Sequence, residues 1–293
     1  KPTPSIANAA LVAIESRSAI DPVNPPLSTL PPPLDLPTRN GDITFSYLWN
    51  LSRAYGGFYK EGVKAVWYNW RAARLLRERL AKEANVKDTD EAAMKGLLKR
   101  SEWQLLQRND HDIGKLPLFG VMVLLFGEWL PLLVPFIPTA VPSTCRIPSQ
   151  IRGMREKAEA RRRVSFREGY PEPSKEQVVA AEESSAPWPT TTAPYVRSLL
   201  GRLRSDQLLH LSSTFDLHFR LWDWLQLPPS RFLMQRSLSK RLQYIAVDDR
   251  LLAQAGGAAK LTGPELERAC EERGLDVLGR KDAVLRDNLT WWL

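Results

Sequence analysis

The stretch LPLFGVMVLLFGEWLPLLVPFIPTAV, which runs from Leu116 to Val141, contains a single ionisable residue, Glu128. A helix needs roughly 20 consecutive apolar residues to cross the hydrocarbon core of a bilayer, and the buried helices of soluble domains are usually shorter. The stretch therefore predicts one transmembrane segment, which we place at residues 113–142.

Prolines interrupt the second half of this stretch, at Pro131, Pro135 and Pro138. Each lacks a backbone N–H and clashes with the preceding helical turn, so we expect a kinked span, or a half-span followed by an interfacial segment. A soluble alternative stays open, in which the prolines divide the stretch into two short helices that are buried in a core.

Glu128 lies near the middle of the stretch, where an ionised carboxylate costs about 2.5–3.5 kcal/mol. It either belongs to an ion or proton path, or is a neutral acid that bonds to a neighbouring helix or faces another subunit. A single span cannot form a pore by itself, so the second interpretation is favoured and the first requires a homo-oligomer.

The composition of the 293-residue chain favours acidic partners. Its 41 Lys and Arg outnumber its 33 Asp and Glu, which gives a formal net charge of +8 and points to anionic lipid or RNA. The two cysteines and three histidines show no CxxC, HxxxH or HExxH spacing, so we expect no zinc site, no thiol catalysis and no cofactor. No nucleophile, base and orienting group occur together in a motif, and we expect no enzyme.

Two kinds of segment precede the apolar stretch. Residues 1–45 are rich in proline and predict a disordered arm. Residues 46–112 predict basic amphipathic helices, one over 46–84 and one over 91–110. Aromatic rings and cations alternate in the first helix, which is what a helix at the membrane interface needs, although an ordinary helix packed on a soluble domain is an equal alternative. The interface residues that we predict are Trp67, Tyr68, Trp70, Arg71 and Arg74.

A dense basic run follows the apolar stretch, between Arg146 and Arg167. Positive charge near the end of a span tends to stay on the side that is not translocated. This run either binds the phosphates of ribosomal RNA or of cardiolipin, or is a solvated helix face. Its candidate contact residues are Arg152, Arg155, Arg161, Arg162 and Arg163.

Residues 170–194, rich in Pro, Ser, Thr and Ala, predict a flexible insert, and leucines at helical spacing follow it. Large aromatic side chains supply much of the buried surface of helical cores. We therefore predict core positions, rather than a binding platform, for Trp222, Trp224, Phe232 and Leu233. His210 and His218 have no Ser or Cys in a triad-like sequence setting, and we expect them to be surface or packing residues.

Residues 260–293 predict a helix, an extended link and a second helix, with Gly274 at the end of the first helix. This pattern resembles SAP-like modules, which often bind nucleic acid, and its phosphate-facing candidates include Arg273 and Lys281. Many acids are interleaved here, so a helical hairpin that caps the core of the domain is the favoured alternative.

Several of these segments together resemble the LETM family of mitochondrial inner-membrane proteins. The resemblance begins with LLKRSEWQLLQR at 97–108 and continues through the apolar stretch with Glu128 and Pro131 to PTAVPST at 138–144, which includes Pro138, Pro142, Ser143 and Thr144. It resumes at 238–275, with Arg241, Asp248, Asp249 and Gly274, and in the closing WWL.

The resemblance implies an all-α protein with one transmembrane helix and a 14-3-3-like ribosome-binding domain, here residues 143–293, that faces the mitochondrial matrix. Its implied partners are the mitochondrial ribosome and inner-membrane lipid, with roles in membrane protein biogenesis and ion homeostasis. The alternative is a potassium or calcium/proton exchange system that uses Glu128. The sequence departs from longer family members, because it has no EF-hand loop and no sustained heptad.

Overall fold

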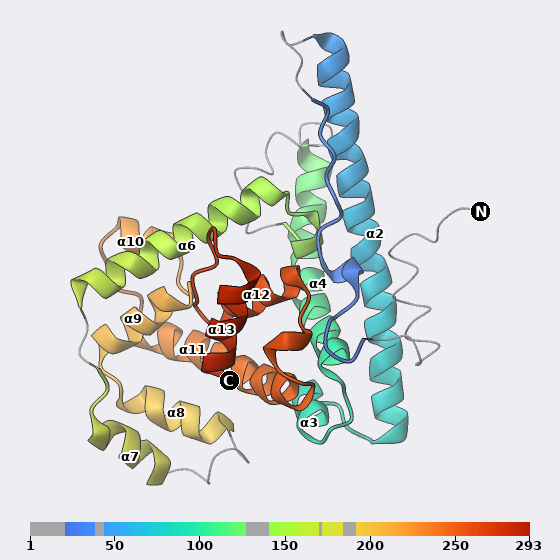
Figure 1. Ribbon diagram of the computed structural model, residues 1–293. Coiled ribbons are helices and arrows are strands. Elements are labelled where there is room, and N and C mark those ends of the chain that lie inside the picture. The colour runs from blue at the N-terminus through green and yellow to red at the C-terminus, as the bar shows by residue number, and fades with distance from the viewer. Residues whose placement is uncertain (1–20, 39–43, 127–140, 170–171, 184–191) are drawn as a thin grey trace. The chain divides into compact units, whose positions relative to one another are not determined.

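The computed structural model describes residues 21–38, 44–126, 141–169, 172–183 and 192–293. The chain divides into two compact units, Lys1–Arg152 (unit 1) and Gly153–Leu293 (unit 2). All regular secondary structure of the described residues is helical (Figure 1). This confirms the all-α fold class.

Unit 1 is built on two long helices. Figure 1 shows α2 and α4 side by side and antiparallel. The buried side of α2 repeats every three or four residues, through Val66, Asn69, Ala73, Leu76 and Leu80, which is the spacing of one helix face. The helices of this unit are η1 (Leu27–Thr29), α2 (Phe45–Glu83), α3 (Thr89–Met94), α4 (Arg100–Phe126) and η4 (Ser143–Cys145).

The second predicted helix, over residues 91–110, is two helices in the structure. Gly96 has a φ of +73° and ends α3, with the Leu97 N–H bonded to the Ala92 carbonyl and the Gly96 N–H bonded to the Ala93 carbonyl. This is the pair of bonds of a Schellman C-cap, for which glycine is favoured. The prediction of one helix was wrong because a lone glycine in a helical pattern can also mark a helix end.

The prediction of a disordered arm was wrong for residues 21–38. The Ser28 hydroxyl donates to Asn69 Oδ1 at 2.6 Å, and Asn69 Nδ2 donates back to the Ser28 carbonyl at 2.9 Å. Arg100 Nη1 donates to the Val23 carbonyl, and Arg108 donates to Thr29. Polar groups of α2 and α4 therefore hold this proline-rich segment. Residues 1–20 and 39–43 lie outside the described residues.

The predicted transmembrane helix receives no support from the described helices, none of which has the length and apolar run that a membrane crossing requires. Helix α4 carries the first part of the apolar stretch, and Leu118, Val121, Leu124 and Leu125 are exposed on it. Residues 127–140, with Glu128, Pro131 and Pro138, lie outside the described residues.

The core of unit 2 joins three helices. Val196 and Leu200 of α8, and Leu203 directly after it, pack with Leu208 of α9 and with α11, which confirms the leucine periodicity as a core. Helix α6 begins at the end of unit 1 and continues into this unit. The helices are α6 (Pro148–Glu168), α7 (Lys175–Glu183), α8 (Thr192–Arg202), α9 (Ser205–Thr214), α10 (Arg220–Trp224), α11 (Arg231–Gln254), η5 (Ala258–Lys260), α12 (Gly263–Glu272) and α13 (Asp282–Trp292).

Two predicted boundaries change. The flexible insert at 170–194 contains α7, which packs on α8 and whose Gln177 side chain donates to the Arg202 carbonyl at 2.9 Å. The predicted matrix-facing domain, 143–293, begins with residues that pack in unit 1, since Ser143 bonds Asp112 and Thr144 bonds the Gly62 carbonyl. Sequence spacing could not show these contacts, because their partners are distant in the chain.

The C-terminal helix, link and helix are confirmed as α12 and α13. Leu266 and Cys270 of α12 pack among the buried residues with Leu285 and Leu289 of α13. Gly274, with a φ of +77°, follows α12 as predicted, and a Cβ there would lie 3.1 Å from the Thr214 carbonyl oxygen. The close approach and the left-handed backbone both require glycine.

Candidate functional site

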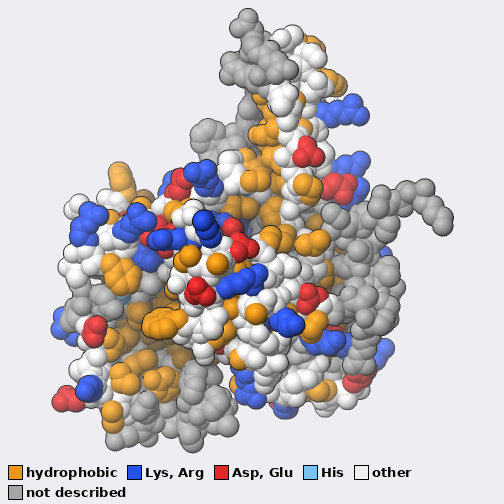
Figure 2. Space-filling view, viewed as in Figure 1, with side chains coloured by type: hydrophobic (Ala, Val, Ile, Leu, Met, Phe, Trp, Pro, Cys, Tyr) orange, Lys and Arg blue, Asp and Glu red, His pale blue; other side chains and the backbone are white. Residues whose placement is uncertain are grey.

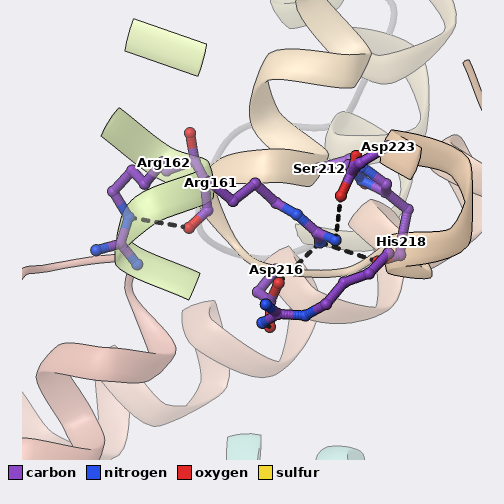
Figure 3. A network of polar contacts seen from close by, with 8 residues as sticks. Arg161, Arg162, Ser212, Asp216, His218 and Asp223 are labelled. Carbon is purple, nitrogen blue, oxygen red and sulfur yellow. Dashed lines mark hydrogen bonds and ion pairs between the residues drawn. The ribbon is translucent and has the colours of Figure 1, made fainter. Parts of the chain in front are cut away.

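Arg161 of α6 is buried in a polar cage rather than exposed to a partner. Its side chain is 8% exposed and pairs with Asp216 and Asp223, and Nη1 also donates to the His218 carbonyl at 2.9 Å (Figure 3). These acceptors lie in and before α10. The cage therefore fixes the short helix α10 against α6.

Two further arginines of the basic run serve the same packing. Arg155 donates to Glu267 and Glu271 of α12, at 2.7 and 3.0 Å. Arg162 is 12% exposed and bonds Glu159 and the Thr214 carbonyl. Arg155, Arg161 and Arg162 thus have partners inside unit 2, and the contact role that the sequence predicted for them stays a prediction.

Arg273 is the most buried of the predicted contact residues. Its side chain and that of Asp248 are both 0% exposed, and it also bonds Asp249 and the Ala269 carbonyl. Burial would lower the pKa of Arg273, but the carboxylates of Asp248 and Asp249 outweigh burial and raise it. Trp292 Nε1 donates to Asp249 at 3.0 Å. Arg273 is therefore enclosed by protein groups, its phosphate contact stays a prediction, and Asp248 and Asp249 hold α11, α12 and α13 together.

Two of the remaining predicted cations, Arg163 and Lys281, lie at the link between α12 and α13. Arg163 is 62% exposed and lies 3.8 Å from Asp276, and Arg280 pairs with the same carboxylate at 3.0 Å. Lys281 is exposed next to Arg280, and Arg167 is exposed one helical turn after Arg163. We call Arg163, Arg167, Arg280 and Lys281 the basic surface. Figure 2 shows Lys and Arg side chains gathered over α6 with acids between them.

The basic surface is the part of the domain whose chemistry fits a polyanion. Arg163 also pairs with Glu159, so two of the four cations, Arg163 and Arg280, have carboxylates beside them. Exposed guanidinium and ammonium groups bind phosphate oxygens without a preformed pocket. Arg152, at the start of α6, is exposed as well.

The two histidines have serine partners that the sequence did not reveal. His210 Nδ1 lies 2.8 Å from Ser165 Oγ, and His218 lies 2.8 Å from both Ser212 Oγ and Asp223 Oδ1. Ser212 is 1% exposed, so its hydroxyl has no access to a substrate. Burial lowers the pKa of His210 more than its hydrogen bond to Ser165 raises it. The serines lie on other helical turns or helices, which is why the sequence shows no motif.

The predicted membrane-interface residues lie on the outward side of α2. Trp67 is 56% exposed and its ring centroid lies 5.0 Å from that of Trp70. Arg71 and Arg74 are exposed, while Tyr68 and Trp70 are half-buried. Figure 2 shows hydrophobic side chains along the N-terminal part of α2, with cations beside them. The structure therefore brings the predicted rings and cations together on one helix.

The family-motif residues mostly make structural contacts. The Ser143 N–H and hydroxyl donate to Asp112, at 2.8 and 2.7 Å. Pro142 precedes η4, and its carbonyl accepts from the Cys145 N–H. The Arg241 guanidinium lies 5.9 Å from the centre of the Tyr244 ring, within cation–π range. These residues position helices and do not form a pocket.

The prediction of core positions around α10 was wrong for three residues. Trp224, Phe232 and Leu233 are exposed, and Trp222 alone of the predicted four is half-buried. Arg161 pairs with Asp216 and Asp223 of this segment, while Trp224 and Phe232 are exposed. The composition of the segment gave no signal of this, since aromatic residues are common in helical cores.

Residues 196–293 match the protein-family model described as LETM1-like, RBD. The match covers most of unit 2, from within α8 to the C-terminus. No curated protein and no solved structure matches the chain.

Proposed function

We propose, from the LETM1-like RBD domain that residues 196–293 carry, that this protein binds the mitochondrial ribosome through unit 2 and is anchored in the mitochondrial inner membrane. The family match is the observation that supports the ribosome as partner. In this proposal the apolar stretch at 116–141 is the anchor, unit 2 faces the matrix, and tethering raises the local concentration of ribosomes at the membrane. Such tethering supports membrane protein biogenesis.

The basic surface supplies the contact in this proposal. Arg163, Arg167, Arg280 and Lys281 are exposed, whereas the side chains of Arg161 and Arg273 are buried against their acids. Binding to ribosomal RNA phosphates through these groups would weaken as salt rises, with a slope that falls by about one for each phosphate contact removed.

The test is ribosome co-sedimentation of the detergent-solubilised full chain at increasing salt. In the double variant Arg167→Gln and Lys281→Gln, we expect weaker binding and a shallower salt dependence, with membrane flotation unchanged. The matched control is Arg204→Gln, an exposed arginine of unit 2 that pairs with Asp206 and lies outside the basic surface. Equal binding of the double variant and the wild type at every salt concentration would remove the basic surface from the mechanism.

Cation/proton exchange is the second function that we propose to test, because Glu128 is the one ionisable residue of the apolar stretch. An exchange path would require several copies of the chain around this carboxylate. Glu128→Gln should abolish proton-coupled potassium or calcium flux in reconstituted vesicles. Normal flux in the variant would exclude the carboxylate from transport.

A further inference from the structure

An exposed apolar patch surrounds α10 in unit 2. Its side chains come from a short segment of the chain and from the first turn of α11, and three of them are aromatic. Trp224 is 78% exposed, Phe219 70% and Phe232 67%. We call the whole set the apolar patch: Phe219, Leu221, Trp224, Leu225, Leu227, Phe232 and Leu233. A single exposed leucine needs no explanation, but a group of large exposed apolar side chains between residues 219 and 233 indicates an interaction site.

The cage of Arg161 holds the patch in this conformation. Arg161 bonds Asp223 within α10 and the His218 carbonyl just before it, and His218 Nε2 lies 2.8 Å from Asp223 (Figure 3). The acids and the histidine of the segment are thus turned toward α6. The apolar side chains of the patch are already exposed, so it needs no rearrangement before binding.

The charge beside the patch is positive. Arg236 and Lys240 follow Phe232 by one and two helical turns on the same side of α11, and both are exposed. Arg231 donates to the carbonyls of Gly201 and Leu203, so its contacts leave its positive charge in place. The acid of α10, Asp223, is neutralised by Arg161.

The shape and composition together identify the occupant. Aromatic side chains that are more than two-thirds exposed protrude from the surface, whereas a groove for a partner helix would enclose them. Protruding rings with Leu and adjacent Arg and Lys are the chemistry of a surface that enters the interface of an anionic bilayer. Cations near an anionic membrane surface each strengthen binding about fivefold.

We infer that unit 2 docks on the surface of a bilayer containing anionic phospholipid through the apolar patch, with Arg236 and Lys240 at the headgroups. The inference rests on the anchoring part of the proposed function, because an anchored chain keeps unit 2 close to lipid. It adds a second membrane contact, on a different face from the basic surface. Ribosome binding and lipid docking therefore use separate residues.

The experiment places a polarity-sensitive dye on the patch of the full chain, through Trp224→Cys. Cys145 and Cys270 are 0% exposed, and burial raises the pKa of their thiols to about 12 and about 11, so the engineered cysteine is labelled selectively at pH 7. The matched control carries the dye through Trp291→Cys, at a tryptophan that is 85% exposed on α13. Both chains are reconstituted into phosphatidylcholine vesicles with or without cardiolipin.

We expect the dye at position 224 to shift to the blue and to be quenched by lipid-borne nitroxide in cardiolipin vesicles, and the dye at 291 to stay unchanged. Adding Arg236→Gln and Lys240→Gln should weaken docking roughly 25-fold. If the chain floats with vesicles but the emission of the dye at position 224 does not shift, the inference is overturned, and a protein becomes the expected partner of the patch. A chain that does not float would overturn the anchoring as well, and an equal shift without cardiolipin would overturn the anionic requirement.

Discussion

The outer side of α2 in unit 1 and the α6–α10 face of unit 2 are both rich in aromatic and basic residues, yet they use them in opposite ways. On the outer side of α2 Arg71 and Arg74 are exposed, and Arg74 pairs with Glu78 one turn away at 2.9 Å. On α6 Arg161 is drawn inside, and the apolar residues of α10 are left outside. Whether an arginine side chain is exposed therefore depends on the groups it pairs with, and not on the amino-acid composition of its segment.

The largest effect is expected when the most buried arginine of unit 2, Arg273, is replaced. Arg273→Leu leaves Asp248, which is 0% exposed, without its counter-charge, and we expect a loss of about 3–5 kcal/mol in the free energy of unfolding. Urea unfolding followed by circular dichroism measures the loss. The control Lys281→Ala, at an exposed site, should change stability by less than about 0.5 kcal/mol. A loss below about 1 kcal/mol in the Arg273 variant would contradict the buried pair.

The reactivity of one buried cysteine in each unit gives a second comparison between the two units. Cys145 lies in unit 1 and Cys270 in unit 2, and burial raises their pKa from 9.0 to about 12 and about 11. The thiolate fraction at pH 8 is thereby about a thousandfold lower for Cys145 and about a hundredfold lower for Cys270 than for an ordinary thiol. Reactivity rises with pH, and Cys270 should react first.

Alkylation across pH 7–10, with each cysteine followed by mass spectrometry, measures this order. The same reaction in urea supplies the unburied reference for both thiols. Equal, rapid alkylation of the native protein at pH 8 would show that these thiols are accessible.

Removing Arg161 from its polar cage should destabilise the protein less than removing Arg273. Arg161→Ala removes a guanidinium that is 8% exposed from Asp216 and Asp223, which are themselves partly solvated, so we expect a loss of about 1–3 kcal/mol. Amide hydrogen exchange should accelerate in α10, while exchange in α2 should stay unchanged. Unaltered exchange in α10 would mean that Arg161 does not hold the apolar patch.

The smallest effect belongs to α2. Arg74→Ala removes an exposed pair with Glu78 and should change stability by only about 0.3–0.5 kcal/mol, less at high salt. Thermal unfolding at two salt concentrations measures the change. A loss as large as that of Arg161→Ala would abolish the contrast between the two regions.

The sequence predicted long helices better than it predicted individual sites. The periodicity over 46–84 corresponds to α2, and Gly274 ends α12 as expected. Gly96 was not recognised as a helix end, and η1 was missed because its stability comes from Asn69 and Arg108, far along the chain. Periodicity records which face of a helix is apolar, but it carries no information about the groups that meet that face.

The candidate site shows the same limit. Five of the seven predicted contact cations, Arg155, Arg161, Arg162, Arg163 and Arg273, have partners inside unit 2. Arg163 and Lys281 remain exposed, and Asp276 connects Arg163 to the link between α12 and α13. A charge run in a sequence looks the same whether its acids lie in solution or on a neighbouring helix.

The sequence by itself determined the helical character of the chain, its basic balance and its likeness to the LETM family, because these depend on composition, spacing and motif order. The tertiary structure alone decided which arginines are buried and which aromatic residues are exposed. The physical reason is that a charged side chain can be buried only when it is paired. Arg161 and Arg273 pair with carboxylates that are far away in the sequence, so they are buried. An arginine without such partners stays on the surface.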